Sequence, residues 1–260
     1  MGIEKAAGAI SGVPRVTALA PSVAGRFYPS DAAELRAMVR DFIGQPTPRA
    51  VRALIAPHAG YVYSGPIAGS AYRLLDTHFR RVLLLGPAHF YPLSGIATHS
   101  ADSFATPLGS VPVERSVATL DAAFENEHSL EVHLPFLQET LGEFTIVPLL
   151  VGDATPEQVA TAIEQAGIDD DTLIVVSSDL THFLDYETAR NHDRNTANNI
   201  ESLRYEEIGP FEACGCRSIA GLLEVARRRD WSVETLDLRN SGDTEGDRDR
   251  VVGYGAFVLA

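Results

Sequence analysis

Three apolar runs in this chain each stop at a side chain that can bind a metal ion. The first run ends at His58, the second at His89 and the third at Asp179. Short runs rich in Leu, Ile and Val, without polar alternation, are typical of strands buried on both faces in a parallel sheet under helices. In such sheets the ligand crevice lies just beyond the carboxyl ends of the strands. The sequence therefore predicts that the three residues share one site, and their chemistry favours a metal site.

Predicted strands alternate with predicted helices along nearly the whole chain, which indicates an α/β fold. Helices are expected over residues 32–43, 64–75, 130–141, 156–166, 186–203 and 218–229. Strands are expected over residues 54–56, 81–86, 93–98, 144–151, 172–177, 232–238 and 251–259. The pattern predicts a single domain over residues 21–260, with a mostly parallel central sheet flanked by helices and a closing antiparallel pair. Residues 1–20 are expected to be a loose tail, 106–112 a surface connection and 240–250 a flexible hairpin or loop.

Charge and cysteine content narrow the class of protein. The 35 acidic and 21 basic side chains give a formal net charge of −14, which repels phosphate backbones and anionic lipids. Nucleic acid and membranes are therefore not expected partners. The two cysteines, Cys214 and Cys216, are too close in sequence to staple distant parts of a fold, which argues against a disulfide-framed secreted domain. Residues 6–13 lack the features of a signal peptide, and no run approaches the roughly 20 apolar residues of a membrane span. A cytoplasmic protein is expected.

His58 and His89 occur in similar settings, next to small residues that let the backbone turn sharply off a strand. A lone histidine at a strand end is more often a hydrogen-bonded structural residue than a ligand, but two in matching contexts favour a shared functional site. Asp179 and His182 add a carboxylate and an imidazole three residues apart, on one face if the chain turns helically there. The alternative for this pair is a helix N-cap aspartate beside an ordinary surface histidine.

Two further clusters carry weaker signals. Glu127 and Glu131 are four residues apart and could share a helix face, whereas His128 and His133 could not, so the spacing is only loosely that of a zinc-binding helix. A capped helix start explains this cluster equally well, and His128 is kept as a secondary site candidate.

Cys214 precedes a predicted helix, whose positive end would lower the pKa of the thiol and favour a thiolate. A thiolate can bind iron, copper or zinc, or act as a nucleophile. The alternative is a small buried hydrophobic residue. Glycine-rich dinucleotide fingerprints and Gly-x-Ser-x-Gly elbows are absent from the sequence, so nucleotide use and serine hydrolysis lack support.

Taken together, these motifs make the chain resemble the Memo family, also labelled AmmeMemoRadiSam system protein B in bacteria and archaea. The resemblance runs from residues 21–29 to 253–255, and its motifs are residues 56–61, 86–89, 127–129, 177–182 and 214–215. It implies a fold like that of the class III extradiol dioxygenases, which are non-haem iron enzymes that open catechol rings. It also implies a metal site made by His58, His89 and Cys214, with Asp179 and His182 as polar residues of the same pocket.

The implied chemistry centres on a modified facial triad. Two histidines and a carboxylate leave positions on Fe(II) for substrate and dioxygen, and here a cysteine would replace the carboxylate. Fe(II) is therefore the first expectation for the metal, copper the second and zinc the third. Asp179, His182 and His128 are the candidate catalytic residues, with His182 as general acid–base and Asp179 orienting it.

Two functions follow from this resemblance. The first is a metal-dependent oxidoreductase acting on a small phenolic substrate. The second is a non-catalytic protein that uses a dioxygenase-like pocket to bind a metal or a peptide. The family label alone adds a radical-SAM enzyme as a pathway partner.

Overall fold

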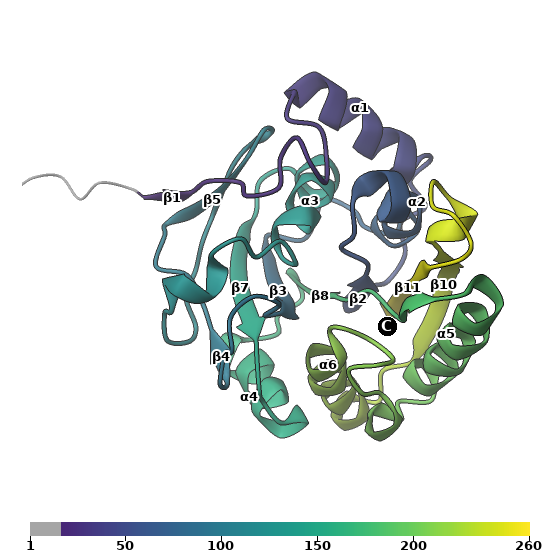
Figure 1. Cartoon of the computed structure of the whole chain (residues 1–260). Coiled ribbons are helices and arrows are strands. Elements are labelled where there is room, and N and C mark those ends of the chain that lie inside the picture. Colours follow the sequence, from purple (N-terminus) through teal and green to yellow (C-terminus); the bar gives the residue numbers. More distant parts are fainter. Residues whose placement is uncertain (1–16) are drawn as a thin grey trace, which may run out of the picture.

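A mixed eight-stranded sheet organises the computed structural model, which describes residues 17–260 (Figure 1). The strand order is β10-β11-β2-β8-β3-β7-β4, and a short strand, β9, pairs with β11. The four inner strands are parallel to one another: β2 (Ala53–Ala56), β8 (Thr172–Ser177), β3 (Arg81–Pro87) and β7 (Thr145–Val151). Antiparallel strands flank them: β4 (Ile96–Ala97), β9 (His182–Leu184), β10 (Val233–Asn240) and β11 (Val251–Leu259). The sheet is thus mixed, where the sequence pattern predicted a mostly parallel one.

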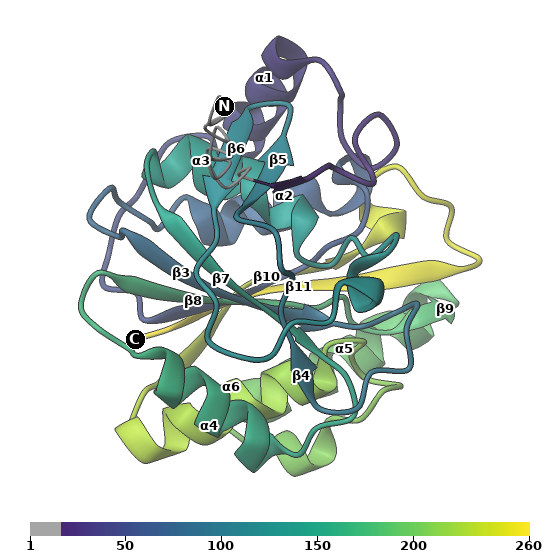
Figure 2. The same cartoon turned by 90° about the vertical axis from the view of Figure 1, so that its left-hand side faces the viewer.

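Helices cover both faces of the sheet and make a three-layered α/β fold (Figure 2). One face carries α1 (Ala32–Ile43), α2 (Tyr61–Tyr72) and α3 (Leu134–Leu141), and the other carries α4 (Pro156–Ala166), α5 (Tyr186–Glu201) and α6 (Cys216–Arg229). Successive residues of β8 alternate between two cores, since Leu173 and Val175 pack in the first and Ile174 and Val176 in the second. Burial on both faces explains why this strand reads as a continuous apolar run.

Local sequence features explain how several helices begin and pack. Helix α1 spans the expected residues because the Asp31 side chain accepts hydrogen bonds from the amides of Ala33 and Glu34, capping its start. Helix α2 begins at Tyr61, three residues earlier than expected, and packs tightly against α1. A Cβ atom on Gly69 would lie 2.2 Å from the carbonyl oxygen of Phe42, so only glycine permits this approach. Short 3₁₀ turns complete the helices: η1 (Asp121–Phe124), η2 (Glu131–His133), η3 (Tyr205–Glu207) and η4 (Ser241–Asp243).

A second, three-stranded sheet replaces the surface connection expected over residues 106–112. Strands β5 (Ser103–Thr106) and β6 (Gly109–Pro112) form a hairpin, and β1 (Ala18–Leu19) pairs with β5 in parallel. The end of the predicted tail is therefore ordered as β1, while its residues 1–16, including 6–13, lie outside the described residues. No helix in the described part of the chain is long and apolar enough to cross a membrane.

Candidate metal centre

The site is built at the carboxyl edge of three adjacent strands. β2 leads to His58, β3 leads to His89, and β8, which lies between them, leads to Asp179. Parallel strands deliver their carboxyl ends to one edge of the sheet, which brings together residues that are far apart in sequence. His128 joins them from the loop between η1 and η2.

His58 is held with a defined tautomer. Its ring is 2% exposed, and Nδ1 lies 2.6 Å from Ser177 Oγ. The Ser177 hydroxyl donates its own proton to the carbonyl oxygen of Ser129 at 2.5 Å, so it must accept from His58 Nδ1–H. The lone pair of His58 is therefore on Nε2. Burial, followed by the neighbouring imidazoles of His89 and His128, places the pKa of His58 well below its usual value, so the ring is neutral.

Glu127 fixes the tautomer of His89 as Ser177 fixes that of His58. Its Oε1 accepts from His89 Nδ1 at 2.9 Å, and its Oε2 accepts from the His89 amide at 2.6 Å. Oε1 also accepts from the amides of His128 and Ser129, each at 2.9 Å. These bonds lower the pKa of Glu127 although burial opposes them, so the group is a carboxylate that occupies Nδ1 of His89 and makes Nε2 the ring nitrogen directed at the site.

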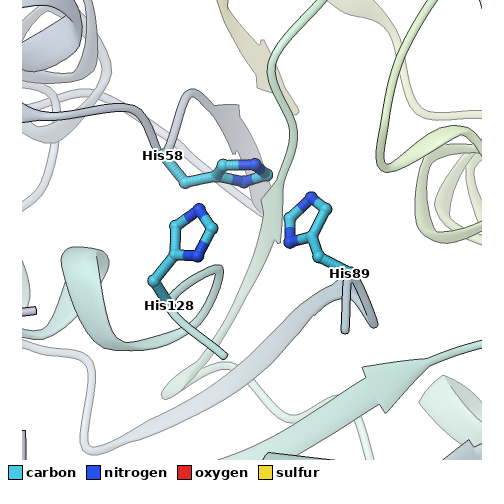
Figure 3. Close-up of side chains that lie close together, drawn as sticks. All are labelled: His58, His89 and His128. Atoms are coloured by element: carbon cyan, nitrogen blue, oxygen red, sulfur yellow. The ribbon is translucent and has the colours of Figure 1, made fainter. Parts of the chain in front are cut away.

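His128 completes a group of three imidazoles that face a common space (Figure 3). Its ring stacks on that of His89 with centroids 5.0 Å apart and an interplanar angle of 11°. The ring of Phe27 packs on His128 at 4.7 Å. Burial lowers the pKa of His128 to about 4, so its lone pair is also available. One donor atom from each of His58, His89 and His128 lies within 4.8 Å of the others, which is close enough for one ion to reach all three.

Cys214 lies beside this group and not within it. Its Sγ is 3.3 Å from His58 Nε2 and accepts a hydrogen bond from the Asp179 amide at 3.2 Å. Burial, and next the charge of Asp179, raise the pKa of the thiol. The sequence predicted a lowered pKa, but α6 begins only at Cys216, and partial burial of Cys214 beside Asp179 disfavours a thiolate.

Asp179 and His182 do not form the predicted helical pair. Residues 178–181 have no helical structure and His182 lies exposed on β9, so the two side chains do not share a helix face. The Asp179 carboxylate accepts from the His58 amide at 2.8 Å, and its Oδ2 is 3.9 Å from His58 Nε2. Burial raises the pKa of Asp179 to about 7. In the described residues its hydrogen-bonding partner is thus His58, where the sequence suggested that it orients His182.

Glu127 is the important site residue that sequence reasoning misjudged. Spacing placed it on a helix face with Glu131, but Glu127 precedes η2 and turns toward His89, whereas Glu131 binds the amides of Ser22 and Val23. The only signal was its position directly before His128. Of the other histidines, His133 bonds to Tyr72 through Nδ1, and His78, His99 and His192 lie outside the group of three imidazoles.

Comparison with known proteins finds related sequences over nearly the whole chain. A family model described as Memo-like protein matches residues 20–258. The chain is 36% identical to a MEMO1 family protein of Archaeoglobus fulgidus, over 92% of this chain and 98% of that protein. It is 34% identical to one from Methanopyrus kandleri over the same shares, and 33% identical to one from Aquifex aeolicus, again over 92% and 98%.

Proposed function

This chain belongs to the Memo-like protein family, and we propose that it is a metal-dependent oxidoreductase whose metal ion binds between His58 and His89. The observation that carries the proposal is the group of three imidazoles, of His58, His89 and His128, with donor atoms within 4.8 Å of one another. The rings of His58 and His89 are held from behind by Ser177 and Glu127, the arrangement that orients histidine ligands in metal sites.

Beside His58 and His89, the side chains near enough to be considered as further ligands are His128, Cys214 and Asp179, whose Oδ2 lies 3.9 Å from His58 Nε2. Ligand distances of about 2.1 Å to nitrogen and about 2.3 Å to sulfur, at a tetrahedral angle, separate the two atoms by roughly 3.6 Å. The observed 3.3 Å between Cys214 Sγ and His58 Nε2 is close to this separation. It equally fits an S–H···N hydrogen bond in the metal-free protein. Metal binding through Cys214 would therefore displace the thiol proton.

Imidazole and thiolate donors bind iron, copper and zinc alike. Fe(II) and copper are the candidates we propose ahead of zinc, because the proposed oxidoreductase needs a redox-active ion. A bound ion of this kind would supply one-electron redox chemistry, with dioxygen as the oxidant.

The side chains around the group suit a small aromatic substrate. Phe90, which is 61% exposed, lies with its ring 6.0 Å from that of His128, and it offers a face on which a phenolic ring can stack. The Asp179 carboxyl group and the His182 imidazole are the groups that can hold or release the protons of a phenol. Asp179 lies in the connection between β8 and β9, and His182 is the first residue of β9.

Oxygen consumption tests the proposal. Protein loaded anaerobically with Fe(II), and separately with copper, is mixed with a panel of catechols and dioxygen uptake is recorded. Asp179→Asn and His182→Ala should lose uptake while retaining the metal, and His192→Ala, an exposed histidine outside the group, serves as the matched control. Metal-loaded protein that consumes no oxygen with any substrate would refute the oxidoreductase and leave a metal-binding role.

A further inference from the structure

A second cavity adjoins the candidate metal centre on the side of α6. It has a volume of about 240 Å³ and is lined by Cys214, by Ala88 next to His89, and by the first turn of α6. This is below the roughly 300–1,000 Å³ of pockets for drug-sized ligands, so its occupant must be small. Tyr91 and Leu93 add aromatic and apolar side chains to the lining. The lining thus combines a polar end, formed by α6, with apolar side chains.

The polar end is suited to an anion. The N-cap residue of helix α6 is Gly215, which has no side chain to cap the helix, and the first turn contains no acidic residue. The positive end of its dipole is therefore uncompensated by the helix itself. Arg217 adds a guanidinium at the same wall, where its partner is the exposed carboxylate of Asp153 at 2.9 Å.

Ser218 is an independent sign of a ligand. It lines the cavity and is fully buried, yet its hydroxyl has no hydrogen-bond partner among the described residues. Buried hydroxyl groups are normally satisfied, because an unpaired one costs free energy. A ligand atom that accepts this hydrogen bond would satisfy it. An acceptor is also what the uncapped helix end requires.

We propose that this cavity binds the carboxylate of a small aromatic acid, anchored by Ser218, Arg217 and the N-terminus of α6. A singly charged carboxylate fits better than a phosphate, because one arginine already paired with Asp153 offers little charge to neutralise a dianion. The aromatic body would lie along Tyr91 and reach toward Cys214 and the imidazoles. The inference rests on the proposed function for the link to chemistry, and it narrows the substrate class from phenols in general to phenolic acids.

Binding can be tested without metal or turnover. Benzoate is titrated into the metal-free protein by calorimetry, with benzyl alcohol as the uncharged probe of similar shape and inorganic phosphate as the alternative anion. Benzoate should bind at least about tenfold more tightly than benzyl alcohol, the usual worth of hydrogen bonds to a charged group. Ser218→Ala and Arg217→Gln should each weaken benzoate binding by about tenfold. Arg227→Gln, at the other end of α6 and paired with Glu206, should leave it unchanged.

Asp153→Asn tests whether the cavity prefers a negatively charged ligand. Asp153 is exposed, so its replacement should not affect folding, and removal of its negative charge should tighten benzoate binding. Equal binding of benzoate and benzyl alcohol, stronger binding of phosphate, or weaker benzoate binding by Asp153→Asn would each overturn the inference. Failure of the two proposals is distinguishable: a protein that binds benzoate but no metal sinks only the proposed function. A protein that retains iron but does not prefer benzoate sinks only this inference.

Discussion

Replacing Glu127 by glutamine isolates the contribution of one buried carboxylate to the candidate metal centre. Glutamine keeps the size of the side chain, but one of its two terminal groups becomes an N–H donor. If the amide nitrogen takes the place of Oε2, the His89 amide loses its acceptor at 2.6 Å, and if it takes the place of Oε1, three N–H groups lose theirs. The first arrangement is therefore the less costly one.

The magnitude follows from that arrangement. One hydrogen bond to a charged group is lost and the other three become neutral, which should lower the free energy of unfolding by about 3 kcal/mol. Since Glu127 also fixes the tautomer of His89, metal affinity should fall by roughly 10- to 100-fold. Denaturant unfolding of the metal-free protein measures the first effect and competitive metal titration the second. Glu125→Gln, two residues earlier and exposed, is the matched control. Glu127→Gln that behaves like this control in both assays would refute the reasoning.

Three other substitutions test the account away from Glu127. Asp193 is buried, and its Oδ2 has no hydrogen-bond partner among the described residues. Burial raises its pKa to about 6, so its ionisation costs stability as pH rises from about 4 to 6. Asp193→Asn should therefore stabilise the protein by about 2 kcal/mol at pH 8 and by little at pH 4, measured by urea unfolding, and equal effects at both pH values would contradict this. Gly69→Ala should destabilise by roughly 1–3 kcal/mol because its Cβ meets backbone of α1, whereas at Gly60, with neighbours no closer than 3.7 Å, the same change should cost much less. Cys214→Ser should leave the melting temperature of the metal-free protein nearly unchanged and reduce the protons released on metal loading, measured in weakly buffered solution; undiminished release would exclude the thiol as a ligand.

Much of the fold could be predicted because its signals are local. The Asp31 cap and helical spacing gave α1, and the continuous apolar run gave β8, each with the observed bounds. The mixed character of the sheet was harder to foresee, since β4 is only two residues long and its direction depends on pairing with β7. The β5–β6 hairpin looked like a loop because Pro and Gly residues surround its turn, yet the cross-strand pairing there is regular.

Part of the candidate site could likewise be predicted from the sequence, and part could not. The positions of His58, His89 and Asp179 follow from parallel strand ends and were predicted to meet. The roles of Glu127 and Ser177 could not be read from the sequence, because they depend on hydrogen bonds between segments that lie 38 and 119 residues apart. The pKa of Cys214 also escaped prediction, since burial of the thiol outweighs the nearby helix end.

Metal retention after anaerobic Fe(II) loading and desalting tests the central claim most directly. The account predicts near-stoichiometric iron in the unaltered protein and its loss in His58→Ala and His89→Ala. His78→Ala, an exposed histidine far from the site, should retain the metal. Cys214→Ser and His128→Ala, measured beside them, identify the further ligand by which of the two loses iron. Iron retained equally by His58→Ala, His89→Ala and His78→Ala would contradict a metal centre at this edge of the sheet.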